Sequence, residues 1–206
     1  MNYSIAHHTH DSPFLQFHGR KAHYLHRLFY LTQGTLLVRL GQHEYVFQAG
    51  ELCWLPAHCL AGVTSLPQTQ WLQVSISTRL MQPYPMQAGK CTPNALLKAC
   101  LNRLSERPAT LDETTQKLTP ELKAIYELVS LELAELAPSL DQQPNLVQWQ
   151  TRLNTQAQDE LNAMLTCRQA LMAQASGKKQ PQIIDELYAG HSAQFSQDMR
   201  QYLGKA

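Results

Sequence analysis

The chain has 206 residues, enough for one sizeable domain and a smaller appendage. Its hydrophobic content of 44% excludes disorder over most of the length, and its formal net charge of +1 excludes an overall basic field, so any contact with DNA must be local. We expect a cytoplasmic protein with no membrane partner, because no apolar run approaches the roughly 18 residues of a membrane span and the N-terminus lacks the features of a signal peptide.

The segment from Tyr24 to Ser77 predicts short antiparallel strands. It is rich in β-branched and aromatic residues and is interrupted by turn signals. The expected strands end at Gly34, run through Val38 to a turn at Gly41, and then cover Glu44 to Phe47 and Leu52 to Leu55. Strands spaced so closely, with no helix between them, favour an antiparallel sandwich or small barrel.

After Pro93 the apolar residues take a helical period. One helix is expected around Ala95 to Leu104. The next has a clear start, with Thr119 as the N-cap and Pro120 in the first helical position. The predicted fold class is therefore α+β, with an N-terminal β-barrel or sandwich followed by an all-helical C-terminal part.

The helix from Pro120 to Leu136 carries a seam of apolar residues spaced by 4, 3, 4 and 3. Its members are Leu122, Tyr126, Val129, Leu133 and Leu136. Two interpretations stay open, an amphipathic helix packed on its own domain or a dimer helix. We predict a homodimer, with these five residues as the candidate interface.

A polar stretch with two prolines, from Leu136 to Pro144, is typical of a linker. We divide the chain at this stretch into a β domain over 1–92, a helical dimerisation segment over 93–138 and a second helical region over 144–206. In the last region an amphipathic segment around Leu161 to Met172 precedes a compact pair of helices.

The strand region carries three motifs in order, Leu31-Thr-Gln-Gly34, Gly41 and Ala49-Gly-Glu-Leu-Cys-Trp-Leu-Pro56. Their order and spacing resemble a cupin, and more closely the N-terminal sensory cupin of the arabinose-regulator (AraC) family of bacterial transcription factors. The resemblance covers roughly residues 20 to 80. It implies a cupin-like domain that binds a small-molecule effector.

Enzymatic cupins hold a metal with an H-x-H pair, a glutamate and a later histidine, and this chain departs from that pattern. With His23 in the second position, the first falls on Lys21, the glutamate on Arg27 and the late histidine on Cys59 or Leu60. Lysine and arginine cannot replace ligands that donate electron pairs to a divalent ion. The five cysteines form no C-x-x-C motif. We therefore expect no catalytic metal, no cofactor and no enzymatic activity.

The barrel interior then becomes a candidate pocket for the effector. The available polar-tipped or aromatic residues are Arg27, Tyr30, His43, Tyr45, Trp54, His58 and Trp71. Ordinary core packing is the alternative for each aromatic residue, and the sequence leaves open which of them point inward.

The C-terminal segment predicts a helix, a short turn at Ala189-Gly190 and a second helix capped by Ser192, whose inner face is Phe195, Met199 and Tyr202 or Leu203. It resembles the first helix-turn-helix of the arabinose-regulator family through Phe195-Ser196, Met199-Arg200 and Gly204-Lys205, while Gln197 replaces the usual arginine. The residues expected to face DNA are Ala193, Gln194, Ser196, Gln197, Arg200 and Gln201.

Together these features predict an effector-responsive transcriptional regulator that binds a small molecule in the cupin and DNA through its last helices. In the resembled family a second helix-turn-helix follows at about the point where this sequence ends, so we expect the chain alone to bind DNA weakly. The alternatives are a metal-dependent cupin enzyme, a free-standing ligand-binding cupin, and a plain helical cap in place of the DNA-binding helices.

Overall fold

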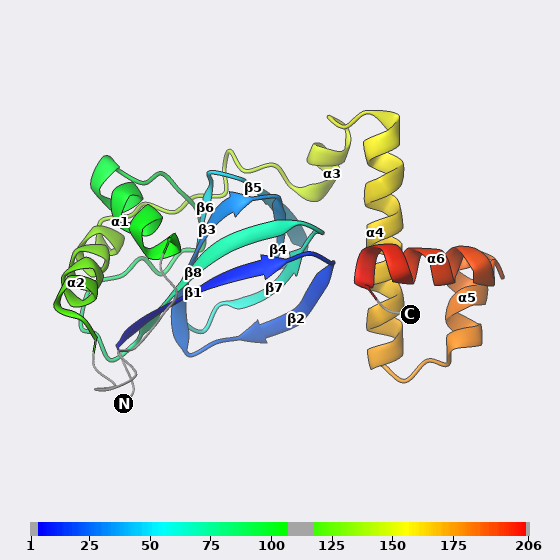
Figure 1. The fold of residues 1–206 in the computed structure, drawn as a ribbon, viewed down its shortest axis with the longest axis horizontal. Helices are drawn as coiled ribbons and strands as arrows, with labels where there is room; N and C mark the ends of the chain where they lie inside the picture. Colours follow the sequence, from blue (N-terminus) through cyan, green and yellow to red (C-terminus); the bar gives the residue numbers. More distant parts are fainter. Residues whose placement is uncertain (1–3, 107–117, 205–206) are drawn as a thin grey trace.

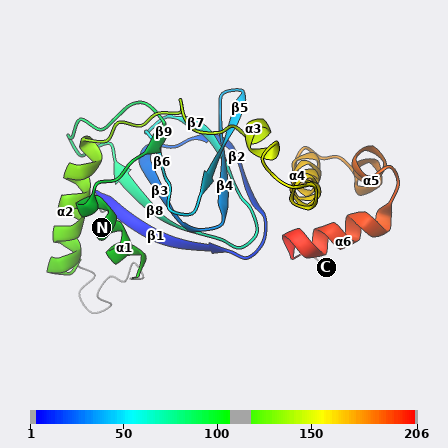
Figure 2. The same ribbon diagram turned by 90° about the horizontal axis from the view of Figure 1, so that it is seen from above.

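The computed structural model describes residues 4–106 and 118–204. Over these residues the chain forms nine strands and six helices, in the predicted α+β arrangement. The strands build an antiparallel sandwich of two sheets. Figures 1 and 2 show this sandwich between two groups of helices, α1 and α2 on one side and α3 to α6 on the other.

The first sheet has five strands. In spatial order they are β1 (Ile5–Ser12), β8 (Thr69–Ser77), β3 (Leu25–Gln33), β6 (Leu52–Leu55) and β9 (Gly89–Cys91). The second sheet has the order β2 (Gln16–Ala22), β7 (Leu60–Ser65), β4 (Thr35–Leu40) and β5 (His43–Gln48). Each pairing is antiparallel. The predicted strands thus correspond to β3, β4, β5 and β6, and the predicted antiparallel sandwich is confirmed.

The turn between β3 and β4 requires glycine. Gly34 has φ of +77°, and a Cβ atom there would lie 2.6 to 2.9 Å from atoms of Gln68 and Thr69. The backbone of the β7–β8 turn therefore comes too close for any side chain at this position. Steric contact with the β7–β8 turn thus explains why the Leu31–Gly34 motif ends in glycine.

Both faces of the five-stranded sheet are buried. Phe29 and Leu31 of β3 point into the sandwich, while Leu28 and Tyr30 point to the outer face. The helices α1 (Ala95–Ser105) and α2 (Pro120–Ala134) cover that outer face and form one apolar cluster with it.

Helix α2 begins as predicted. The Thr119 side chain accepts a hydrogen bond from the backbone N–H of Leu122, and Pro120 occupies the first turn. The apolar seam, however, packs inside this chain. Leu122, Tyr126, Val129 and Leu133 are buried in the cluster under α2, and Leu136 packs against the same cluster. The seam thus follows the first of the two interpretations, an amphipathic helix packed on its own domain.

The polar stretch expected to be a linker lies along the sandwich instead of spanning open solvent. Ser139 forms a backbone bridge with Lys90 beside β9, and Asn145 forms one with Tyr45 of β5. Gln143 is buried, and its amide donates to the carbonyl of Val46. This stretch, residues 137–145, is called the strap below.

The strap leads to α3 (Leu146–Gln150), α4 (Thr155–Ala175), α5 (Gln180–Tyr188) and α6 (Ser192–Leu203). Ala189 and Gly190 take the left-handed conformation between α5 and α6. Ser192 is the first residue of α6 and not its cap; His191 occupies the N-cap position, and its side chain makes no cap hydrogen bond. Its inner face is Phe195, Met199 and Tyr202, as predicted, with Asp198 buried beside them. The chain position Lys205 lies outside the described residues.

The helical region docks on the outer face of the four-stranded sheet. Arg168 of α4 makes a two-pronged ion pair with Glu44 of β5, with N–O distances of 2.5 and 3.0 Å, and also donates to Thr64 of β7 at 3.1 Å. At the end of α6 the carbonyl of Tyr202 accepts from the backbone N–H of Leu15 at 2.7 Å. Among the described helices, none is both long and apolar enough to cross a membrane.

Candidate ligand-binding site

A cavity of about 560 Å³ lies between the two sheets. Five of the residues that line it can carry positive charge, namely His10, His18, Lys21, His23 and Arg27. Its apolar wall is formed by Phe17, Leu25, Phe29, Ala61, Val63 and Trp71, and Gln73 and Ser75 add neutral polar groups. None of the described residues that line it is a carboxylate. A volume of this order is ordinary for a small-molecule site.

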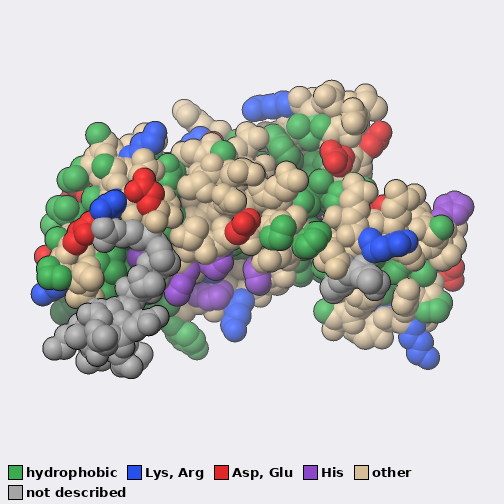
Figure 3. Space-filling model, viewed as in Figure 1, with side chains coloured by type: hydrophobic (Ala, Val, Ile, Leu, Met, Phe, Trp, Pro, Cys, Tyr) green, Lys and Arg blue, Asp and Glu red, His purple; other side chains and the backbone are tan. Residues whose placement is uncertain are grey.

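The alternation of the strands explains which side chains enter the cavity. On β3 the odd-numbered Leu25, Arg27 and Phe29 line it. On β1 and β8, His10 lies directly opposite Trp71, and their rings stack with centroids 4.7 Å apart. Figure 3 shows histidine side chains gathered on the face that carries β1 and β2, where His8 and His18 are exposed. The cavity is therefore open to solvent on this side and enclosed at Arg27 and Trp71.

Three nitrogen atoms of the cavity wall are buried without a hydrogen-bond partner among the described residues. They are Arg27 Nε, Trp71 Nε1 and His10 Nε2. Arg27 is 9% exposed and Trp71 is 5% exposed. The Arg27 guanidinium carbon lies 5.5 Å from the centroid of the Phe29 ring. Buried polar groups are nearly always satisfied in folded proteins, so three such atoms around one cavity mark a place where a ligand can supply acceptors.

The electrostatics of the cavity favour negative charge. Burial lowers the pKa of Arg27, and the nearby thiols of Cys53 and Cys59 do not offset its charge because burial also raises their pKa values. The pKa of His23 is lowered by burial and then by Arg27 and Lys21. The pKa of His10 is lowered by burial and then by His8 and His18.

Only two of the seven expected ligand-binding residues line this cavity, Arg27 and Trp71. Tyr30 and Trp54 point to the outer face of the sheet, where they donate to Asn102 and to the carbonyl of Pro85 at 3.0 and 2.9 Å. Tyr45 packs in the apolar cluster between the sheets. His43 and His58 are exposed, and His58 adopts the left-handed conformation in the loop after β6.

Sequence reasoning missed His10, because it predicted no strand before Tyr24. The first twelve residues show no alternation of apolar and polar residues, since His7 to Ser12 are all polar, so no periodic signal marks this strand. Lys21 and His23 were considered only as positions for metal ligands, and the structure places both at the cavity.

The cavity residues do not suit a metal ion. Lys21 and Arg27 stand where the resemblance to enzymatic cupins placed a histidine and a glutamate, and both are cations with no electron pair to donate. His26 lies on the outer face, where its ring stacks on Trp54, and Nδ1 accepts from the N–H of Ala57. Over the described ranges, no group of three or more His, Cys, Asp or Glu residues is arranged to hold a metal.

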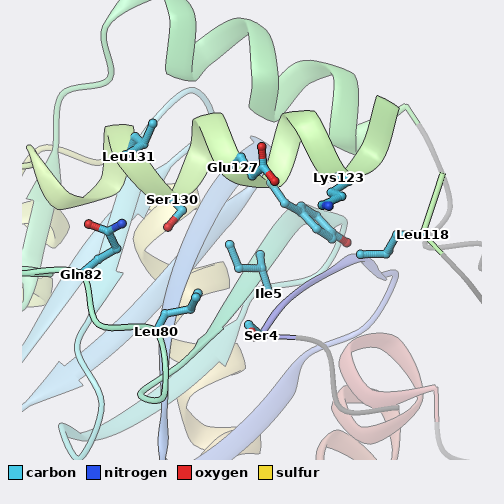
Figure 4. A pocket seen from close by; sticks show the side chains of 10 residues that line it. Ser4, Ile5, Leu80, Gln82, Leu118, Lys123, Glu127, Ser130 and Leu131 are labelled. Carbon is cyan, nitrogen blue, oxygen red and sulfur yellow. The ribbon is translucent and has the colours of Figure 1, made fainter. Parts of the chain in front are cut away.

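A second cavity, of about 520 Å³, lies between the first residues of β1 and helix α2. Figure 4 shows Ile5 and Leu80 on its sheet side and Ser130, Glu127 and Leu131 on α2. It borders Ser4 and Leu118, the first residues of the two described ranges.

The six residues expected to face DNA all lie on the exposed side of α6. These are Ala193, Gln194, Ser196, Gln197, Arg200 and Gln201. Gln194 donates to Asp198 at 2.6 Å, and Arg200 Nε donates to the carbonyl of Ser196 at 3.2 Å. The single basic side chain among the six provides little attraction for phosphate.

No family model matches the sequence, and no curated protein matches it significantly. Solved structures similar to its N-terminal part include a cupin-superfamily protein from Desulfitobacterium hafniense, with 10% identity, 37% of this chain and 71% of the other covered, and a TM-score of 0.35. An RmlC-like cupin from Shewanella frigidimarina has 16% identity and the same TM-score of 0.35, and the match covers 39% of this chain and 72% of the other. A Cupin 2 conserved barrel domain protein from Salinispora arenicola has 16% identity, covers 38% and 68%, and has a TM-score of 0.34. The helical region lies outside these similarities.

Proposed function

We propose that the protein is a ligand-responsive regulator, in which a small molecule bound between the sheets controls how the C-terminal helices contact DNA. The observation that carries this proposal is the shared strand β7. Its residues Ala61 and Val63 line the cavity, while Gly62 and Thr64, on its other face, lie against α4. A ligand that shifts β7 therefore acts directly on the surface where α4 docks.

The contact between α4 and the sandwich has the features of a defined docking arrangement. Arg168 and Glu44 are only 14% and 15% exposed, and two parallel hydrogen bonds fix their geometry. A groove of about 450 Å³ runs beside this pair, between α4 and the outer face of β7. A ligand changes the population of docked helices only to the extent that it binds the two arrangements with different affinity.

The proposal assigns binding and not catalysis to the cavity. Lys21 and Arg27 hold and orient an acceptor group and cannot ligate a metal, so no catalytic step is placed there. Elemental analysis of untagged purified protein addresses the enzyme alternative. Stoichiometric iron, manganese, nickel or zinc would contradict the proposal.

DNA binding is tested by fluorescence anisotropy with the DNA upstream of the protein's own gene, at low and at physiological salt. We expect weak, salt-sensitive binding that changes when the cavity is occupied, and loss of binding in an Arg200→Ala, Gln197→Ala variant. A matched control is Gln174→Ala, an exposed residue of α4. Absence of DNA binding even at low salt would reject the regulator and leave a free-standing ligand-binding protein.

A further inference from the structure

We infer that the ligand of the cavity between the sheets is a small organic anion, whose carboxylate or phosphate group is held by Arg27, while Trp71 and His10 offer hydrogen bonds to a second polar group of the ligand. The inference rests on the proposed function, because it names the chemical class of molecule that the same cavity accepts.

Buried hydrogen-bond donors lie along the wall of this cavity. Arg27 Nε and Trp71 Nε1 are N–H donors, they are buried, and neither has an acceptor among the described residues. The third atom, His10 Nε2, lies on the ring that stacks on Trp71. In the strand register Arg27 lies opposite Ser75 and Trp71 lies opposite Leu31, so Arg27 is four positions along the sheet from the Trp71–His10 pair. The Arg27 donor therefore suits an anionic group, and the Trp71 and His10 nitrogens suit another acceptor of the same ligand.

The positive charge of Arg27 is also not balanced, because its guanidinium has no ion pair among the described residues. Two carboxylates of the sandwich have other partners, since Glu51 pairs with Lys90 at 2.5 Å and Glu44 pairs with Arg168. An unpaired buried cation is costly, and an anionic ligand removes this cost when it binds.

Positively charged side chains line the cavity from its opening inward. Lys21 and His18 are exposed at the open side, His23 is half-buried, and Arg27 lies deepest. A cleft lined by charges of one sign concentrates ligands of the opposite sign. The electrostatic field therefore draws an anion towards Arg27.

The apolar wall of the cavity determines what kind of group the rest of the ligand carries. Phe29, Ala61 and Val63 surround the charged end, and the cavity of about 560 Å³ has room for a ring or short chain in addition to the anionic group. Inorganic phosphate would leave this wall uncovered. We therefore expect an organic anion to bind more tightly than inorganic phosphate.

The test is isothermal titration of the full chain at constant ionic strength with four probes, benzoate, phenyl phosphate, inorganic phosphate and the neutral benzamide. We expect benzoate or phenyl phosphate to bind at least about tenfold more tightly than benzamide, since hydrogen bonds to a charged group are stronger than those to a neutral one. The comparison of benzoate with phenyl phosphate decides between a carboxylate and a phosphate ester. Preference for inorganic phosphate over both would show a phosphate site without an organic part and would overturn the inference.

Variants test the assigned residue. Arg27→Met should reduce the preference for the anion to about that of the neutral probe, while Arg27→Lys, which keeps the charge and loses the planar donors, should retain part of it. Arg79→Met is the matched control, because Arg79 is exposed beyond the end of β8. Circular dichroism and thermal melting establish that each variant is folded.

Three results would overturn the inference. The first is equal binding of benzoate and benzamide to the unchanged protein, and the second is an unchanged preference for the anion in folded Arg27→Met. The third is failure of all three anions to bind at about 20 mM, a concentration that detects even weak ligands with millimolar Kd. These outcomes are separate from failure of the regulator. Binding of benzoate with no change in DNA binding would reject the regulator and keep the anion site, whereas DNA binding that responds only to neutral ligands would do the reverse.

Discussion

Replacing Arg27 by methionine is expected to make the ligand-free protein more stable. A buried, unpaired cation costs about 3 kcal/mol of desolvation, of which the contact with the Phe29 ring returns about 1 kcal/mol. Methionine fills a similar volume and has no charge. We therefore expect Arg27→Met to raise the free energy of unfolding by about 2 kcal/mol, in contrast to most core substitutions, which lower it.

Urea unfolding followed by tryptophan fluorescence measures this change. Trp54 and Trp71 are buried in the sandwich, so their emission reports on its unfolding. The exposed-arginine control, Arg79→Met, should change the free energy of unfolding by less than about 0.5 kcal/mol. A folded Arg27→Met protein that is less stable than the unchanged chain would refute the reasoning, because it would show that the guanidinium already has a compensating partner.

Three other predictions follow from the core, the docking contact and the histidines. Leu133→Ala should lower the free energy of unfolding in urea by about 2–5 kcal/mol, because Leu133 is fully buried under α2, whereas Leu131→Ala at a position 55% exposed should cost under about 1 kcal/mol. Arg168→Met leaves the mostly buried Glu44 unpaired and should increase amide hydrogen exchange in α4 to α6, and an added Glu44→Gln substitution should reverse part of that increase; exchange as slow as in the unchanged chain would contradict a docking role. Burial lowers the pKa values of His10, His23 and His26 below the ordinary value of 6.5. Below that pH the unfolded chain therefore binds more protons than the native chain, and the melting temperature should fall as pH drops from about 6.5 towards 5. A saturating anion should lessen this fall in the melting temperature.

Local signals in the sequence were sufficient to predict the strands β3 to β6 and the start of α2. Glycine turns separate those strands, and Thr119 with Pro120 marks the helix start by a capping bond that acts within one turn. Such features depend on neighbours in the chain, so the sequence shows them directly.

The inward direction of the candidate ligand residues could not be predicted for a physical reason. Strand β3 is buried on both faces, by the opposite sheet on one side and by α1 and α2 on the other, so its residues His26 to Leu31 form one continuous buried run. Without alternation between apolar and polar residues, the pattern does not distinguish the cavity face from the helix face. Arg27 and Tyr30 were therefore both candidates, and only Arg27 lies on the cavity face.

The same limit applied to the apolar seam on α2 and to the strap. A seam with heptad spacing buries itself equally well on a sheet or on a second helix, so its spacing does not name the partner. In the strap only Ala137, Asp141 and Gln142 are exposed, and Gln143 is buried despite its polarity. The strap backbone pairs with β5 and β9 through bonds that leave no pattern in the sequence.

The position of β1 at the edge of its sheet has a consequence for the newly made chain. Among the described strands, β1 pairs only with β8, with Ile5 opposite Ile76 and Ser12 opposite Thr69. At a synthesis rate of about 5–20 residues per second, β8 is translated on the order of several seconds after β1. During that interval the nascent sandwich lacks one wall of its cavity, including the stacked pair of His10 and Trp71. The cavity between the sheets is therefore complete only after ribosomal synthesis has passed β8.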